Sequence, residues 1–448
     1  MSGKTSEVTG NVREVTGRTR EVTGNPREVT ANRRDPGSLR RPPVELPRVL
    51  APRALPLSRQ PPIQAPMNDV VIVGGGPGGS SAAIGLQQQG VRDVLLLDRA
   101  HFPREKTCGS GLSPSAIELA KVLGVSEELH QRAVALTSVK IVTPQGHAMV
   151  IASNAAAVVL LRAEFDDMLH RRALALGTQF EGGVRVAGLV HEHGRVVGVR
   201  LSDGTERRAK VVVCADGAHS IFSVDRRPKR TISTLMGWWE GVDFVPGQAE
   251  MIFDKNLMPL YGWLFPETKT RVNIGICMDG QGTDGEKTER NVREVFAQFI
   301  KDHYETRLLG ASQIGKLKGH PISYTTWVEA CAVPGALYVG EAARVTHNAT
   351  GEGISQAMQS GLYAAETVAD VLAGKKTEAQ AWRDYTWKHR KRFTAGFLGG
   401  HALRVAVRTR VLDGVATVYN QPMIRRGVVR LLGSALAGSA VKDASATA

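Results

Sequence analysis

The spacing of hydrophobic residues along the chain changes sharply at about residue 67. Before that point a seven-residue repeat, such as Arg13-Glu14-Val15-Thr16-Gly17, offers one regular apolar position, whereas a coiled coil needs two. The stretch 35–66 is then rich in proline and arginine. Such a chain cannot bury enough apolar surface to offset the entropy lost on ordering, so residues 1–66 are predicted to be a disordered, low-complexity tail.

The first ordered pattern is a strand, a glycine turn, a helix and a second strand. Residues 70–73 are a β-branched run typical of a buried parallel strand. Residues 80–89 have a small-residue face and end at Gly90, which predicts a helix, and the apolar run 94–98 predicts the next strand. This strand–helix–strand unit of about thirty residues predicts a Rossmann-like α/β fold.

In later segments the apolar residues follow either the spacing of a strand or the spacing of a helix. Alternating or continuous apolar runs predict strands at 138–143, 198–201 and 271–277. Apolar residues recurring at helical spacing predict helices over 162–176, 289–301 and 354–372. The last seventy or so residues are also helical in pattern, with arginine on one face.

Composition and charge exclude several classes of protein. Hydrophobic residues make up 42% and charged residues 22%, which is ordinary for a globular chain. The net charge of +14 can indicate nucleic acid or an anionic membrane, but no zinc finger, RNA-recognition signature or aromatic-basic ladder accompanies it, so no nucleic-acid partner is expected. No run of about 18 apolar residues is present, so no membrane span is predicted. The expected location is the cytoplasm, with the membrane surface as an alternative, and the oligomeric state stays open.

The cysteines lie far apart, without a CxxC pair, at Cys108, Cys214, Cys277 and Cys331. This spacing argues against a metal site and against a disulfide framework, and it fits a reducing compartment.

A dinucleotide-binding fingerprint lies between the first strand and the first helix, where its function requires it. Gly74 permits the tight turn, Gly76 lets the backbone approach a pyrophosphate, and Gly79 lets helix and strand pack closely. The helix N-terminus offers free N–H groups and the positive end of its dipole to phosphates. Asp98 ends the second strand, where an acid receives ribose hydroxyls. The residues predicted to bind the cofactor here are Gly74, Gly76, Pro77, Gly78, Gly79, Asp98 and Arg99.

Two later segments indicate which kind of dinucleotide is bound. One is a strand that runs into Asp216-Gly217, and the other is a strand that ends in Gly340-Glu341 and is followed by the sequence Thr-Gly-Glu-Gly-Ile at 350–354. In this order the motifs resemble those of the FAD-dependent hydroxylase superfamily over residues 69–370. The resemblance implies that Glu341 bonds the ribityl chain and that the helix after Gly353 directs its dipole at the cofactor. It adds to the cofactor site Arg162, Asp216, Gly340, Glu341, Gly351, Gly353 and Ile354.

The chain departs from that pattern at several positions. The usual Gly-Asp pair is Gly340-Glu341, and the usual glycine and proline of the following loop are Arg344 and Asn348. Phe222 and Ser223 stand where an arginine usually follows the Asp-Gly turn. FAD binding is still expected, while the electron donor, NAD(P)H or another reductant, stays open.

Two further segments indicate a subgroup within this superfamily. Residues 102–112 resemble the PRxKxCG loop of geranylgeranyl reductases, and residues 259–266 resemble their YxWxFP strand. In that family the strand lines an apolar tunnel for an isoprenoid chain and the loop lies beside the flavin. The resemblance adds Arg104, Cys108 and Gly109 to the cofactor site and implies Cys108, Tyr261 and Trp263 as catalytic residues, with Tyr261, Trp263 and Phe265 as substrate contacts.

The residue types fit that chemistry. Saturating a C=C bond needs a hydride from reduced flavin and a proton on the other carbon, in a dry cavity. Tyr261, Trp263 and Phe265 alternate along a predicted strand, so they share one face and can form an aromatic wall. The structural alternative is that these rings are ordinary core and that Cys108 is a small buried apolar residue. The predicted substrate is an isoprenoid, whether a geranylgeranyl lipid, a menaquinone side chain, a chlorophyll precursor or another polyene.

Other functions remain open at this point. A monooxygenase or flavin halogenase shares the fold, although halogenases of this group carry Gly-Glu-Ser where Cys108-Gly109-Ser110 stands. A non-catalytic flavin-binding or membrane-docking protein gains support only from the basic C-terminus.

The predicted organisation is a discontinuous FAD-binding domain (67–135, 156–230 and 331–372) interleaved with a mostly antiparallel β-sheet substrate domain (136–155 and 231–330), followed by a C-terminal helical region (373–448). This last region is either a membrane-interface helix or a cap over the FAD domain. Its basic residues are Arg390, Lys391, Arg392, Arg404, Arg408, Arg410, Arg425, Arg426 and Arg430, interleaved with the apolar Phe393, Phe397, Leu398, Leu403, Val405, Val407, Val411, Val428, Leu431 and Leu432.

Overall fold

A computed structural model describes residues 67–218, 220–223, 230–280 and 291–419. The predicted tail, residues 1–66, lies outside this range, as do the basic and apolar positions of the C-terminal pattern beyond residue 419.

A parallel sheet forms around the first β-branched run, as the sequence predicts. β1 (Met67–Val73) lies between β2 (Val94–Asp98) and β9 (Glu206–Cys214) and runs parallel to both. β6 (Gln179–Gly182) extends the sheet beyond β2, and β16 (Ala336–Tyr338) extends it beyond β9. Every residue of β2 is buried, which is the pattern of a parallel strand covered on both faces. β15 (Ala332–Val333) pairs with β16 at one edge, and the hairpin of β7 (Val186–Glu192) and β8 (Arg195–Leu201) joins the sheet through pairing of β8 with β9.

The helices next to this sheet pack through small residues. α1 (Pro77–Gln88) contacts α6 (Ile354–Leu372), and a Cβ atom on Gly361 of α6 would come within 2.3 Å of the Gly78 carbonyl oxygen. α1 begins at Pro77, three residues earlier than predicted, because proline suits the first helical position. α6 has the predicted bounds. The remaining helices of this part are α2 (Pro114–Val122), α3 (Ser126–Arg132) and α4 (Arg162–Ala175).

A second sheet is antiparallel except for one pair, which confirms the predicted fold class. Its strand order is β14 (Ser312–Ser323), β10 (Thr231–Glu240), β13 (Arg271–Asp279), β12 (Gly262–Pro266), β11 (Gln248–Ile252), β4 (Val134–Val142), β5 (Ala148–Val159) and β3 (Gly111–Leu112). Only β11 and β4 run parallel to each other. α5 (Val292–Tyr304) packs on this sheet, where a Cβ on Gly262 would meet the Phe299 ring at 2.1 Å.

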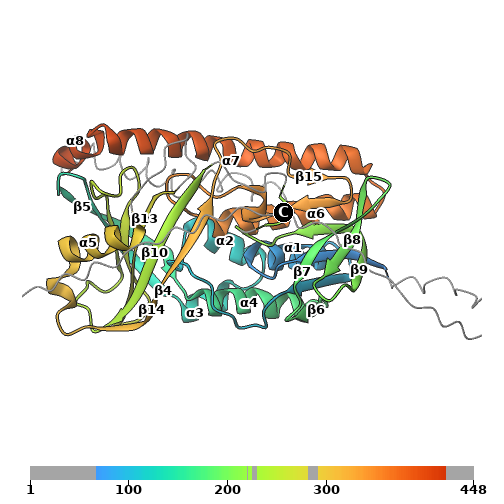
Figure 1. The fold of residues 1–448 in the computed structure, drawn as a ribbon, viewed down its shortest axis with the longest axis horizontal. Coiled ribbons are helices and arrows are strands. Elements are labelled where there is room, and N and C mark those ends of the chain that lie inside the picture. Colours follow the sequence, from blue (N-terminus) through green and yellow to red (C-terminus); the bar gives the residue numbers. More distant parts are fainter. Residues whose placement is uncertain (1–66, 219, 224–229, 281–290, 420–448) are drawn as a thin grey trace, which may run out of the picture. The chain divides into compact units, whose positions relative to one another are not determined.

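The C-terminal helices join the two sheets. α7 (Glu378–Arg408) starts with a capping box at Thr377 and Gln380, and α8 (Val411–Val418) follows it. Near its start Trp382 donates to the Val333 carbonyl of β15 at 2.9 Å, and near its end Arg404 pairs with Asp279 of β13. Figure 1 shows α7 in orange-red running past elements of both sheets. Within the described ranges, no helix is both long and apolar enough to span a bilayer.

The buried residues of α7 decide between the two interpretations for part of the basic and apolar C-terminal pattern. Phe393, Phe397 and Val407 are buried against the rest of the protein, and Arg404 is buried and ion-paired. These four residues therefore belong to the cap interpretation, and their inclusion in a membrane-facing surface is wrong. A helix of this length has a buried face and an exposed face, and the sequence pattern did not show which residues lie on each.

Candidate cofactor and substrate site

The glycine turn has the geometry that its motif requires. Gly74 adopts φ +100°, and a Cβ there would lie 2.4 Å from the Ala215 carbonyl oxygen. A Cβ on Gly79 would lie 1.8 Å from the Gly74 carbonyl oxygen. At Gly76, by contrast, a Cβ would approach just one heavy atom of the described residues within 4 Å, Nη2 of Arg104 at 3.4 Å. The first and third glycines are thus fixed by packing, whereas the second faces space that a ligand can fill.

The acid at the end of β2 is already engaged with the backbone. Asp98 Oδ2 accepts from the Gly75 N–H at 2.7 Å, and Oδ1 accepts from the Ala100 N–H at 2.9 Å. Arg99 beside it is exposed. Asp98 therefore shapes the glycine turn in this structure, and the predicted bonding of Asp98 and Arg99 to a ribose stays a prediction.

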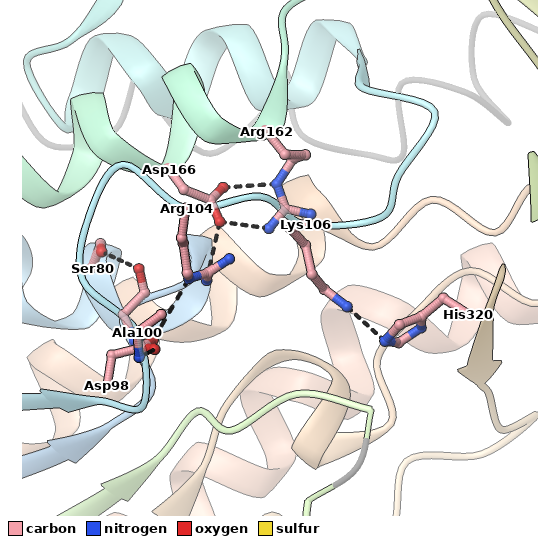
Figure 2. A network of polar contacts seen from close by, with 9 residues as sticks. Ser80, Asp98, Ala100, Arg104, Lys106, Arg162, Asp166 and His320 are labelled. Atoms are coloured by element: carbon pink, nitrogen blue, oxygen red, sulfur yellow. Dashed lines mark hydrogen bonds and ion pairs between the residues drawn. The ribbon is translucent and has the colours of Figure 1, made fainter. Parts of the chain in front are cut away.

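Two arginines are fixed beside the turn by one buried carboxylate (Figure 2). Arg162, the first residue of α4, binds both oxygens of Asp166 at 2.7 and 2.8 Å. Arg104 reaches the same carboxylate at 3.2 Å and Asp98 at 3.8 Å. Burial alone would lower the pKa of Arg162, but the Asp166 carboxylate raises it above its usual value, so the guanidinium stays charged. Asp166 was missed in the sequence, although its spacing of four residues from Arg162 was a usable signal.

The Asp-Gly turn after β9 presents an unsatisfied acceptor. Asp216 Oδ2 accepts from the Ile221 N–H at 3.1 Å, while buried Oδ1 has no hydrogen-bond partner among the described residues. Burial raises the pKa of this carboxyl group. A buried polar atom without a partner is rare in proteins and fits a position that bonds to a ligand hydroxyl.

The Gly-Glu segment is held from two sides. Gly340 has φ +63° and donates its N–H to Ser360 Oγ at 2.8 Å. Glu341 Oε1 accepts from the Ser323 N–H at 2.8 Å, which ties the segment to β14. Burial raises the pKa of Glu341, and nearby Lys106 opposes this shift. Arg344 adopts φ +58°, a left-handed conformation that explains why glycine is usual at this position.

The loop before α6 is organised by a histidine. His347 Nδ1 accepts from the Thr350 N–H at 3.2 Å, and Nε2 donates to the Gly396 carbonyl of α7 at 3.0 Å. Gly351 adopts φ +66°, and Gly353 caps α6 without a side-chain hydrogen bond. α6 begins at Ile354. Its first N–H groups therefore receive no side-chain cap from Gly353.

The aromatic row lies against the cysteine loop. Neighbouring rings of Tyr261, Trp263 and Phe265 are 6.3 and 6.1 Å apart, so the three share a face as predicted. A Cβ on Gly109 would lie 3.2 Å from Trp263 Nε1, and one on Gly111 would lie 3.3 Å from the Phe265 ring. The structure thus brings the two reductase-like segments, residues 102–112 and 259–266, into direct contact.

The polar atoms of the row are turned away into the protein. The Tyr261 hydroxyl donates to the Thr350 carbonyl at 2.6 Å, and Trp263 Nε1 donates to Asn273 Oδ1 at 2.7 Å. A Cβ on Gly275 would lie 2.2 Å from the Trp263 ring, so this glycine makes room for the indole. Asn273 and Gly275 were not recognised in the sequence, because their relation to Trp263 depends on the register between β12 and β13.

These residues suit FAD. The backbone approach at Gly76, two fixed guanidinium groups and a buried acceptor at Asp216 match the diphosphate and hydroxyl groups of a flavin dinucleotide. In the described residues no group of three or more His, Cys, Asp or Glu side chains could hold a metal ion.

Comparisons with known proteins agree with this chemistry. A model of the FAD-binding domain family matches residues 67–395. The digeranylgeranylglycerophospholipid reductase of Thermoplasma acidophilum is 27% identical, over 72% of this chain and 84% of the relative. The menaquinone reductase of Mycolicibacterium smegmatis is 29% identical, over 72% and 80%.

Solved structures share the fold. A geranylgeranyl bacteriochlorophyll reductase-like protein from Thermoplasma acidophilum superposes with a TM-score of 0.70 at 22% identity, covering 82% of this chain and 99% of that one. The flavin-dependent brominase Bmp2 gives a TM-score of 0.68 at 23% identity, covering 83% and 94%.

Proposed function

The chain belongs to the FAD-binding domain family, and we propose that it is an FAD-dependent reductase that saturates C=C bonds of an isoprenoid chain. The observation that carries this proposal is the packing of the Tyr261-Trp263-Phe265 row against the Cys108–Gly111 loop. The names of its relatives, which reduce an isoprenoid glycerophospholipid and a menaquinone, support the substrate class.

The cofactor would be held by residues on both sides of the glycine turn. Backbone at Gly76, with Arg104 and Arg162, would receive the diphosphate, and Asp216 and Glu341 would receive hydroxyl groups. Bound reduced FAD supplies the hydride. The electron donor that reduces it would be NAD(P)H or another reductant. Anaerobic titration of the enzyme with NAD(P)H, followed by flavin absorbance, distinguishes the two.

The aromatic row would hold an apolar chain and exclude water. Tyr261 and Trp263 are buried, and Phe265 is half-buried. Because the hydroxyl and the indole N–H already donate to Thr350 and Asn273, a substrate would meet ring faces and edges only. Burial also raises the pKa of Tyr261 well above 10. Tyr261 and Trp263 would therefore position substrate, and Cys108 is the remaining catalytic candidate of the three.

An anaerobic assay tests the proposal. The enzyme is reduced with dithionite and incubated with digeranylgeranylglycerophospholipid and separately with menaquinone. The masses of the products are then measured by mass spectrometry. We expect a gain of two hydrogen atoms for each bond saturated, without oxygen. A requirement for oxygen, with a hydroxylated or halogenated product, would instead establish the monooxygenase or halogenase alternative.

A membrane location is proposed from the outward face of α7. Trp387, Leu398 and Val405 are 60%, 65% and 45% exposed and recur at helical spacing. The Lys391 ammonium lies 5.3 Å from the Trp387 ring centre. Exposed apolar side chains flanked by basic ones suit an anionic membrane surface, which is also where an isoprenoid lipid resides.

A further inference from the structure

Lys106 and His320 form a pair that the proposed reaction has not yet used. The Lys106 ammonium donates to His320 Nε2 at 2.6 Å (Figure 2). Lys106 lies two residues before Cys108 in the same loop, and His320 lies half-exposed on β14, an edge strand of the antiparallel sheet. The pair thus connects the cysteine loop to a solvent-accessible edge.

The charges around Lys106 are mixed. The charges of Arg162 on α4 and of Arg104 in the same loop disfavour the ammonium form of Lys106, while Glu341 and Cys108 favour it. Burial, followed by the charge of Arg162, lowers the pKa of Lys106 to about 8, although Glu341 opposes this shift. An amine in this environment can give up a proton near neutral pH, which an ordinary surface lysine does not do.

The contacts continue from Lys106 to the aromatic row. Cys108 lies close enough to the Arg162 guanidinium to interact with it electrostatically. The residue after Cys108, Gly109, lies against Trp263, and Gly111 lies against Phe265. The loop that carries Lys106 therefore extends from the half-exposed histidine to the proposed substrate wall.

We propose that Lys106 and His320 form a proton relay that supplies the proton consumed when the double bond is saturated. This inference rests on the reductase function proposed above. The C=C π bond is replaced by two C–H bonds, one formed with the flavin hydride and one with a proton. The Lys106 ammonium becomes an amine as it releases that proton, and protonated His320 returns one through Nε2 and is itself reprotonated by water.

A purely structural role is already filled by neighbouring contacts. Glu105 and Lys318 pair between the same loop and the same strand, and the Ser323 N–H holds Glu341. A lysine beside a neutral imidazole adds little to such a connection, but it is a suitable arrangement for moving a proton.

The coupling can be measured without turnover. NMR of histidine ring nitrogens in the FAD-bound enzyme, with His320 assigned by its loss in His320→Gln, should show a change near pH 8 as Lys106 titrates. This change should disappear in Lys106→Met. A His320 signal with the same pH dependence in both proteins would overturn the relay.

Turnover provides the second test. Lys106→Arg keeps the positive charge but cannot release a proton at these pH values, so we expect saturation per bound flavin to fall about 100-fold, the scale of lost general acid catalysis. Since the wild type needs the ammonium, its rate should decline above about pH 8, and Lys106→Arg should lack this decline. His320→Gln, which keeps a hydrogen-bond acceptor, should also be slow.

Lys318→Met is the matched control, because it removes the adjacent ion pair and should leave rate and pH profile unchanged. If the wild type saturates isoprenoids and Lys106→Arg does so equally fast, the relay is wrong and the reductase function stands. If the wild type saturates no isoprenoid, the reductase function is wrong, and the relay falls with it whatever the variants do.

Discussion

At the scale of the residue, Gly76 is the position where the cofactor site can be blocked with little effect on the fold. Its backbone is extended, with φ −72° and ψ −175°, a conformation that valine adopts without strain. Gly76→Val should therefore fold but purify without flavin, as judged by absorbance, because the side chain fills the space beside Arg104.

Gly188→Ala is the control for this change, since a Cβ at Gly188 meets no atom within 4 Å. It should retain flavin fully. A Gly76→Val protein that is as yellow as the wild type would contradict the assigned cofactor site.

Tyr261→Phe tests how the aromatic row is held. The change leaves the Thr350 carbonyl without its 2.6 Å donor, and an unsatisfied buried acceptor costs about 1–3 kcal/mol. We expect a lower free energy of unfolding in denaturant and slower turnover. Tyr419→Phe, which removes a longer bond of 3.3 Å to Val150, should change stability less. Equal losses in the two variants would show that the Tyr261 hydroxyl has no special role.

Cys108→Ala should lower turnover more than FAD affinity. Cys108 directly precedes Gly109, which lies against Trp263, and it is not part of the glycine turn at residues 74–79. We therefore expect its loss to leave the backbone contacts to the phosphates in place. Flavin content by absorbance and the saturation rate separate the two effects. A variant that loses flavin without slowing the remaining holoenzyme would place Cys108 in the cofactor site alone.

At the scale of the element, the sequence predicted local structure but not which distant segments contact one another. The bounds of α6 and the turn at Gly74–Gly79 follow from spacing and from glycine geometry, which are properties of neighbouring residues. The edge strand β14 was not anticipated because half of its residues are exposed and the sequence gives little apolar alternation. Asn273 was missed because it meets Trp263 through the register between β12 and β13. His320 was missed because its partner, Lys106, lies in a loop 214 residues away in the sequence.

The loop before α6 should respond to acid through His347. Burial lowers the pKa of His347 below 6.5, because protonated Nδ1 would face the donors of Thr350. Its stabilising contribution is then complete above pH 6.5, the unfolded value, and is lost as pH falls through the folded pKa. The difference in melting temperature between wild type and His347→Asn should shrink from pH 7 to pH 5. The exposed His401→Asn should show no such trend, and a constant His347 difference would refute the assigned tautomer.

At the scale of the whole molecule, α7 has a buried inward face and an exposed outward face. Its inward face holds the loop before α6, since His347 and Asn348 donate to the carbonyls of Gly396 and Phe397. Deleting the C-terminal region would therefore remove part of the proposed cofactor site together with any membrane contact. Point changes on the outward face separate the two.

Vesicle sedimentation tests that outward face. The wild type should bind vesicles that contain anionic lipid, and binding should weaken as added salt shortens the Debye length from about 10 to 3 Å. Trp387→Ala combined with Leu398→Glu should abolish binding while retaining flavin, because both side chains point away from the buried face. Val122→Glu, at an apolar position of α2 that is 52% exposed, should bind like the wild type. Equal binding to neutral vesicles would exclude the electrostatic contribution, and no binding to either would leave α7 as a cap whose exposed tryptophan has another purpose.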